Sequence, residues 1–131
     1  MLACRGVRGA TVAEDNTREA ILEATRELLL ALVQGNDMEL EDIGCVFFTT
    51  TPDLTAEFPA LAARQLGWTD LAMLCGHEID VPGSLRRCIR VLVLWNTARS
   101  AREITHCYLG EAARLRPERT AAPLPSGWTP A

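Results

Sequence analysis

Arginine is the residue type in this sequence best suited to chemistry. All 13 basic residues of the 131-residue chain are arginines, and none is a lysine. The planar guanidinium can bind a carboxylate through two parallel hydrogen bonds, which a lysine ammonium group cannot do. Coding bias is the better explanation for most of them. An arginine that binds a carboxylate must therefore be identified by its place in the fold. Arg8 and Arg90 are candidates, because both belong to strand-like segments.

Cysteine and histidine are too scattered to predict a metal site. The histidines are His77 and His106 alone, and no two cysteines have the C-x-x-C spacing of zinc or redox sites. We therefore expect no metal and free thiols. Most cysteines should be small buried hydrophobes in strands. They are Cys4, Cys45, Cys75, Cys88 and Cys107.

Composition limits the classes of partner. A formal net charge of -4 gives no broad electropositive surface for a phosphate backbone, so nucleic acid is not expected. The longest apolar stretches fall far short of the roughly 20 residues that cross a bilayer. The first residues lack the pattern of a signal peptide, and we expect a cytoplasmic protein. With 48% hydrophobic and 23% charged residues, the chain has the composition of one globular domain.

The clearest local signal is a helix over residues 17–34. Asn16 followed by Glu19 has the spacing of a capping box, apolar residues recur at helical spacing, and Gly35 marks the end. A second, shorter helix follows Phe58-Pro59 and ends at Gly67.

The remaining segments favour strands. β-branched and aromatic runs alternate with turn residues, which indicates an α+β sheet with helices on one face. One domain over residues 1–118 and a C-terminal tail over 119–131 are expected. The predicted strands cover residues 2–13, 43–50, 71–75, 88–95 and 104–109, with a helical turn at 111–115.

Five collinear segments carry a family resemblance. They are Arg5 to Thr11, then Thr51 to Leu54 with Phe58 to Ala60, then Cys75 with Glu78 to Val81, then Cys88 to Val91, and finally His106 to Leu109 with Leu115 to Pro117. Each is short, but together they resemble the AroH class of chorismate mutases over roughly residues 3 to 118. The resemblance implies a mixed five-stranded sheet packed on helices, a trimeric pseudo-α/β barrel, and active sites between neighbouring subunits.

The resemblance also implies a reaction. Members of this class are isomerases of aromatic amino acid biosynthesis that rearrange chorismate to prephenate without a cofactor. The reaction needs the reactive conformer to be held and negative charge on the ether oxygen to be stabilised. By resemblance, Arg90 contacts the ether oxygen, Glu78 orients the ring hydroxyl, and Arg8 and Tyr108 bind substrate.

Other positions match the walls and mouth of the family's site. The matching residues are Cys75, Phe58, Ala60, Arg64, Leu115 and Arg116, of which Phe58 and Ala60 come from the adjacent subunit in the family. Two departures remove polar groups, because Leu61 stands where the family often has lysine and Leu74 where it often has threonine. They affect the expected affinity for substrate more than the expected reaction.

Two alternatives from other functional classes remain open. A trimeric module could bind a small acid and lack activity, in which case it would bind the dicarboxylate without turnover. An imine deaminase of the RidA type also builds trimers of similar fold with an interface arginine. The pairing of Glu78 with Arg90 in the matched segments argues against the deaminase.

Overall fold

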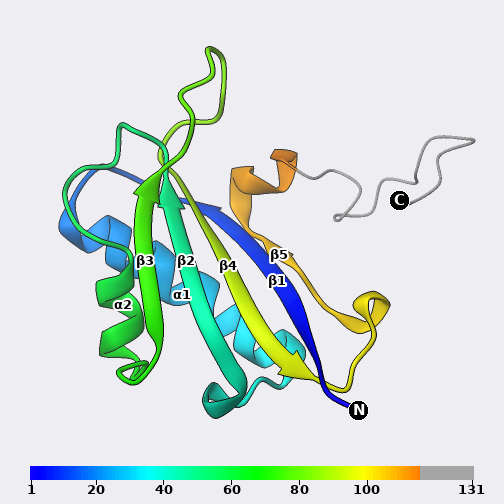
Figure 1. The fold of residues 1–131 in the computed structure, drawn as a ribbon. Coiled ribbons are helices and arrows are strands. Elements are labelled where there is room, and N and C mark those ends of the chain that lie inside the picture. Colours follow the sequence, from blue (N-terminus) through cyan, green and yellow to red (C-terminus); the bar gives the residue numbers. More distant parts are fainter. Residues whose placement is uncertain (116–131) are drawn as a thin grey trace, which may run out of the picture.

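The computed structural model describes residues 1–115, and a five-stranded mixed sheet organises them (Figure 1). The strand order is β3-β2-β4-β1-β5. Strand β4 pairs antiparallel with both β1 and β2, whereas β3 runs parallel to β2 and β5 runs parallel to β1. The strands are β1 (Ala3–Val12), β2 (Ile43–Thr50), β3 (Ala72–His77), β4 (Cys88–Thr97) and β5 (Cys107–Tyr108).

Two helices cover one face of this sheet, behind the strands in Figure 1. They are α1 (Arg18–Asn36) and α2 (Ala60–Gln65). Every second residue of β4 points toward them, so Val91 and Val93 are buried in the core with Leu28 and Leu32 of α1. Gly9 permits this close packing, because a Cβ there would lie 3.0 Å from a methyl carbon of Leu28.

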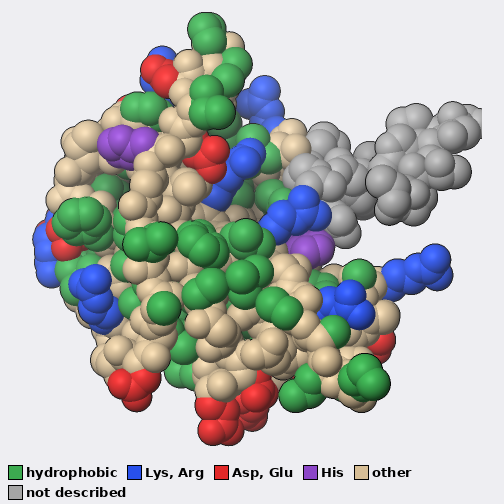
Figure 2. All heavy atoms as spheres, viewed as in Figure 1, with side chains coloured by type: hydrophobic (Ala, Val, Ile, Leu, Met, Phe, Trp, Pro, Cys, Tyr) green, Lys and Arg blue, Asp and Glu red, His purple; other side chains and the backbone are tan. Residues whose placement is uncertain are grey.

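The opposite face of the sheet, which we call the open face, has little covering. The 3₁₀ helix η3 (Gly110–Leu115) packs over one end of it. A small cluster of Ala10, Cys88 and Ala112 is buried there. The rest of the face carries exposed apolar side chains, and Figure 2 shows them gathered over the strands.

Helix α1 begins and ends differently from the prediction. The N-cap is Thr17, whose side chain accepts a hydrogen bond from the Ala20 amide, and not Asn16. Asn16 instead bonds a distant loop at Thr55. The helix continues through Gly35 because the left-handed residue that ends it is Asp37, with φ of 53°.

Strand β5 is shorter than predicted. Residues 104–109 have strand-like sequence, but only Cys107 and Tyr108 pair with β1. Ile104 instead caps the 3₁₀ helix η2 (Ala101–Glu103), and Thr105 bonds to a side chain of α1. The chain therefore reaches the edge of the sheet late and leaves it after two residues.

The prediction that most cysteines are buried is wrong. All five lie in strands and all are free thiols, but Cys88 alone is buried. The reason is the open face: in the single chain, little packs over that side of the sheet apart from η3 at one end, or over edge strand β3. Cys4 and Cys75 are exposed as a result.

The α+β class, the mixed five-stranded sheet and the covering of one face agree with the prediction. The predicted tail at 119–131 lies outside the described residues. Within residues 1–115, no helix has the length and apolar character needed to cross a membrane.

Candidate active site on the open sheet face

Strand register brings the predicted catalytic residues together. On the open face Arg90 of β4 lies between Thr49 of β2 and Ala10 of β1, and Ala10 in turn pairs with Tyr108 of β5. The small neighbours leave space around the guanidinium. Arg8 lies two residues from Ala10, so its side chain points to the same face.

These residues line one cleft, of about 300 Å³. Its walls come from β1, β2, β4 and β5 and from the residue that follows β3. The four residues predicted at the centre of the site all belong to it. The lining consists of Arg8, Gly9, Phe47, Thr49, Glu78, Arg90, Val91, Leu92 and Tyr108.

Glu78 is held in place by β2. Its amide donates to the Thr50 carbonyl at 2.8 Å, which continues the β2–β3 pairing one residue beyond β3. The Thr49 hydroxyl donates a short hydrogen bond to Glu78 Oε2. The carboxylate is therefore oriented toward the strand position next to Arg90.

The two arginines of the cleft have no carboxylate partner among residues 1–115. The ion pair found in this part of the chain joins Arg99 to Asp37, away from the cleft. Arg8 and Arg90 can therefore offer guanidinium donors to an anion from solvent. Burial raises the pKa of the neighbouring Cys88 thiol, although the charge of Arg90 and a hydrogen bond with it oppose the rise.

A second cavity, of about 390 Å³, contains two other predicted residues, Phe58 and Cys75. Cys75 pairs with Phe48, whose side chain is buried on the helix side, so Cys75 does not share the face of Arg90. Phe58 is 67% exposed on the loop between β2 and α2. Asn16 anchors that loop, because its Oδ1 accepts hydrogen bonds from the amides of residues 55 and 56.

The other predicted residues occupy varied positions. Leu115 borders a third cavity together with Glu78 and Arg90. Ala60 is buried in the core, and Arg64 is exposed near the end of α2. Arg116 lies outside the described residues.

The two departures from the family pattern also lie in different settings. Leu61 is half-buried on α2, whereas Leu74 is 66% exposed on the open face. In the register of the sheet Leu74 pairs with Phe47, which pairs with Leu92. Leu74 therefore extends the exposed apolar surface beside the cleft.

Sequence reasoning missed five lining residues, Gly9, Phe47, Thr49, Val91 and Leu92. Each lies in a predicted strand, but the sequence does not show which strands are neighbours or in what register. The sequence did contain a signal for Thr49. A polar residue that alternates with apolar residues in a strand is expected to point away from the core.

The fold and the cleft define an α+β protein whose site suits a small anionic molecule. The model of the chorismate mutase type I family matches residues 4–119. The chain is 50% identical over 119 residues to the chorismate mutase AroH of Thermus thermophilus, covering 90% of this chain and 98% of that protein. It is 42% identical over 115 residues to the AroH of Bacillus subtilis strain 168, covering 87% and 91%.

A solved structure gives the same result. The chorismate mutase from Clostridium thermocellum superposes with a TM-score of 0.82 at 47% sequence identity, covering 83% of this chain and 97% of that one. The chain therefore belongs to the chorismate mutase type I family.

Proposed function

We propose that this chain is a chorismate mutase, an isomerase of aromatic amino acid biosynthesis, and that it rearranges chorismate to prephenate in the cleft on the open face. One observation carries the assignment of the site. Arg8 and Arg90 line the same cleft as Glu78 and Tyr108, and neither arginine is ion-paired with a carboxylate of residues 1–115. A dicarboxylate substrate supplies the negative charge that such a cleft lacks.

The rearrangement is intramolecular. An ether C–O bond breaks while a C–C bond forms, so no nucleophile or proton transfer is required. Catalysis depends on holding the two ends of the substrate close together and on stabilising charge at the ether oxygen. Arg90 suits the second task because it lies between small residues of the cleft and its guanidinium is not ion-paired with a carboxylate of residues 1–115.

The neighbouring residues suit recognition. Arg8, at the β1 side of the cleft, binds a substrate carboxylate, and the Tyr108 hydroxyl adds a hydrogen bond there. Glu78, oriented by Thr49, accepts a hydrogen bond from the ring hydroxyl. Its negative charge also limits the repulsion between the two arginines.

The complete site takes residues from two subunits of a homotrimer. Phe58 and Cys75 line a different cavity from Arg90 in the single chain, so one chain alone does not assemble the predicted set. The open face supports association, because Leu74, Phe47 and Leu92 form a row of exposed apolar side chains. Burying such a row between subunits removes apolar surface from water, which is favourable. The cytoplasm is the compartment that we propose for this enzyme.

The decisive assay follows the loss of chorismate absorbance on adding purified protein without added metal or cofactor. Prephenate is confirmed by its conversion to phenylpyruvate in acid. Saturable turnover supports the proposal. If calorimetry shows chorismate binding without turnover, the protein is a binding module; hydrolysis of an imine such as 2-aminoacrylate would favour the deaminase.

A further inference from the structure

Strand β5 carries Tyr108 into the cleft, yet little of its own pairing holds it. Only Cys107 and Tyr108 pair with β1, and one further hydrogen bond joins the Leu109 amide to the Ala10 carbonyl at 2.9 Å. Residues 98–106, which lead to β5, include only the single turn η2. Something outside the sheet must fix this segment if Tyr108 is to have a defined position.

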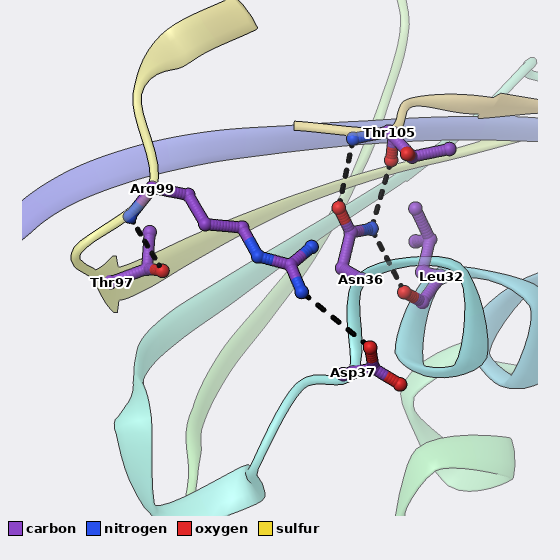
Figure 3. Close-up of polar contacts among 6 residues, drawn as sticks. All are labelled: Leu32, Asn36, Asp37, Thr97, Arg99 and Thr105. Atoms are coloured by element: carbon purple, nitrogen blue, oxygen red, sulfur yellow. Dashed lines mark hydrogen bonds and ion pairs between the residues drawn. The ribbon is translucent and has the colours of Figure 1, made fainter. Parts of the chain in front are cut away.

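The side chain of Asn36, at the end of α1, supplies that restraint (Figure 3). Its Oδ1 accepts from the Thr105 amide at 2.8 Å, and its Nδ2 donates to the Thr105 carbonyl at 2.9 Å. The amide group thus satisfies both backbone polar groups of Thr105, as a neighbouring strand would. A second donation, to the Leu32 carbonyl at 2.9 Å, orients the amide on the helix.

Burial makes this arrangement specific. Asn36 is fully buried, with 0% of its surface exposed. An amide that loses its partners in such a place costs much more than an exposed one, so the geometry that satisfies Asn36 is strongly preferred. The adjacent Gly35 also packs against this segment, because a Cβ there would lie 3.6 Å from Thr105 Cγ2.

The segment that Asn36 holds continues directly into the cleft. Next to Thr105 lies His106, whose Nδ1 accepts a hydrogen bond from the Arg8 amide at 3.0 Å. Tyr108 follows two residues later and lines the cleft with Arg8. Asn36 itself does not line the cleft. Figure 3 also shows that the start of the same connection is held by Arg99, whose ion pair with Asp37 spans 3.5 Å.

We infer that Asn36 is a positioning residue for substrate binding, which acts by holding Thr105 so that Tyr108 and Arg8 face the same ligand. This inference rests on the proposed function. A purely structural role would lower stability and leave the affinity of the folded enzyme for chorismate unchanged. The two roles therefore differ in KM.

The test compares Asn36→Leu, Asn36→Ser and the matched control Thr25→Val. Thr25 is also fully buried on α1. Its hydroxyl donates to the Ile21 carbonyl four residues earlier, at 2.7 Å, so its hydrogen bond is internal to the helix. Kinetics are measured at a temperature at which circular dichroism shows each variant folded. We expect KM for chorismate to rise about tenfold in both Asn36 variants, with a smaller change in kcat, and to stay within about twofold in Thr25→Val.

A double-mutant cycle tests the route through the tyrosine. In a Tyr108→Phe background the effect of Asn36→Ser on KM should shrink to about threefold or less, because the two residues act on one contact. An undiminished effect, or a KM unchanged by either Asn36 variant, would overturn the inference.

Amide hydrogen exchange gives a readout that does not need activity. In Asn36→Ser the amides of Arg8 and Leu109 should be accelerated by a larger factor than the amide of Val93 in the centre of the sheet, whose change reports the loss of global stability. Acceleration of the first two amides by no more than that of Val93 contradicts the inference even if Asn36→Leu fails to fold. A wild-type protein without turnover would instead contradict the proposed function.

Discussion

At the scale of single residues, the fork geometry of Arg90 matters more than its charge. Arg90→Lys keeps the positive charge but loses the planar arrangement of donors that can contact an ether oxygen and a carboxylate together. We expect kcat to fall by about 100-fold, the loss typical of removing one donor to a developing oxyanion, with a smaller change in KM. Steady-state kinetics with chorismate measure both constants.

Arg26→Lys is the matched control, because Arg26 is exposed on α1 on the helix side of the sheet. It should keep the wild-type kcat and KM. An Arg90→Lys enzyme with unchanged kcat would remove Arg90 from the catalytic role.

The central residues of the candidate site could be predicted from the sequence because each lies in a short matched segment. What the sequence could not provide was the division of the wider set of predicted site residues between two cavities. Cys75 and Glu78 are three residues apart, yet Cys75 lies toward the helix side and Glu78 lines the cleft on the open face. Strand pleating and the end of β3 decide this, and neither is visible without the register.

At the scale of elements, two adjacent residues at the start of α1 have separate roles. Thr17 caps the helix, whereas Asn16 anchors a distant loop. Thr17→Ala removes the side-chain oxygen that accepts from the Ala20 amide, and should lower the free energy of unfolding by about 1 kcal/mol. The kinetic constants should not change, because Thr17 touches neither cavity. Urea unfolding followed by circular dichroism measures the loss.

Thr17→Ser retains the hydroxyl and should keep most of the stability. Equal losses in the alanine and serine variants would show that the hydroxyl is not the stabilising group. Asn16→Ala provides the contrast, since it leaves the cap intact and removes the contacts that anchor the loop bearing Phe58. Asn16→Ala should therefore raise KM, provided that Phe58 forms part of the site.

Most elements were predictable because their apolar residues follow the period of the structure that they form. Strand β2 occupies residues 43–50 as predicted, since its branched and aromatic residues need no distant contact to favour a strand. The ends of α1 and β5 were not predictable to the same degree. They depend on Asn16 bonding to Thr55 and on Asn36 bonding to Thr105, contacts that join residues 39 and 69 positions apart.

At the scale of the whole molecule, Asp53 links stability to pH. Burial alone would raise the pKa of this carboxyl, but hydrogen bonds from the Thr51 side chain and from the backbone amides of Asp53 and Arg87 outweigh it. The pKa therefore lies below its ordinary value of 3.8. As pH falls, the unfolded chain takes up this proton before the folded one does. The stabilisation is thus present above the unfolded pKa and is lost as pH falls through the folded one.

Asp53→Asn should remove this dependence. Below about pH 5 the free energy of unfolding should fall less steeply in Asp53→Asn than in the wild type, as measured by urea titrations at a series of pH values. Asp70→Asn, which makes the same change at an exposed position, is the control and should follow the wild type. Parallel pH curves for the wild type and Asp53→Asn would contradict the linkage.

The arrangement of subunits can be tested by mixing two inactive variants. Arg90→Ala disables the cleft on the open face, and Phe58→Asp places a negative charge in the second cavity, where it repels a dicarboxylate. Because Phe58 is 67% exposed in the single chain, this change should leave the subunit folded.

If each site combines the Arg90 cavity of one subunit with the Phe58 cavity of its neighbour, subunit exchange creates some sites with neither change. Random exchange of an equal mixture should then restore about a quarter of wild-type activity, because each wall is intact in half of the sites. Sites contained within one chain would give no recovery, since every chain carries one of the two changes.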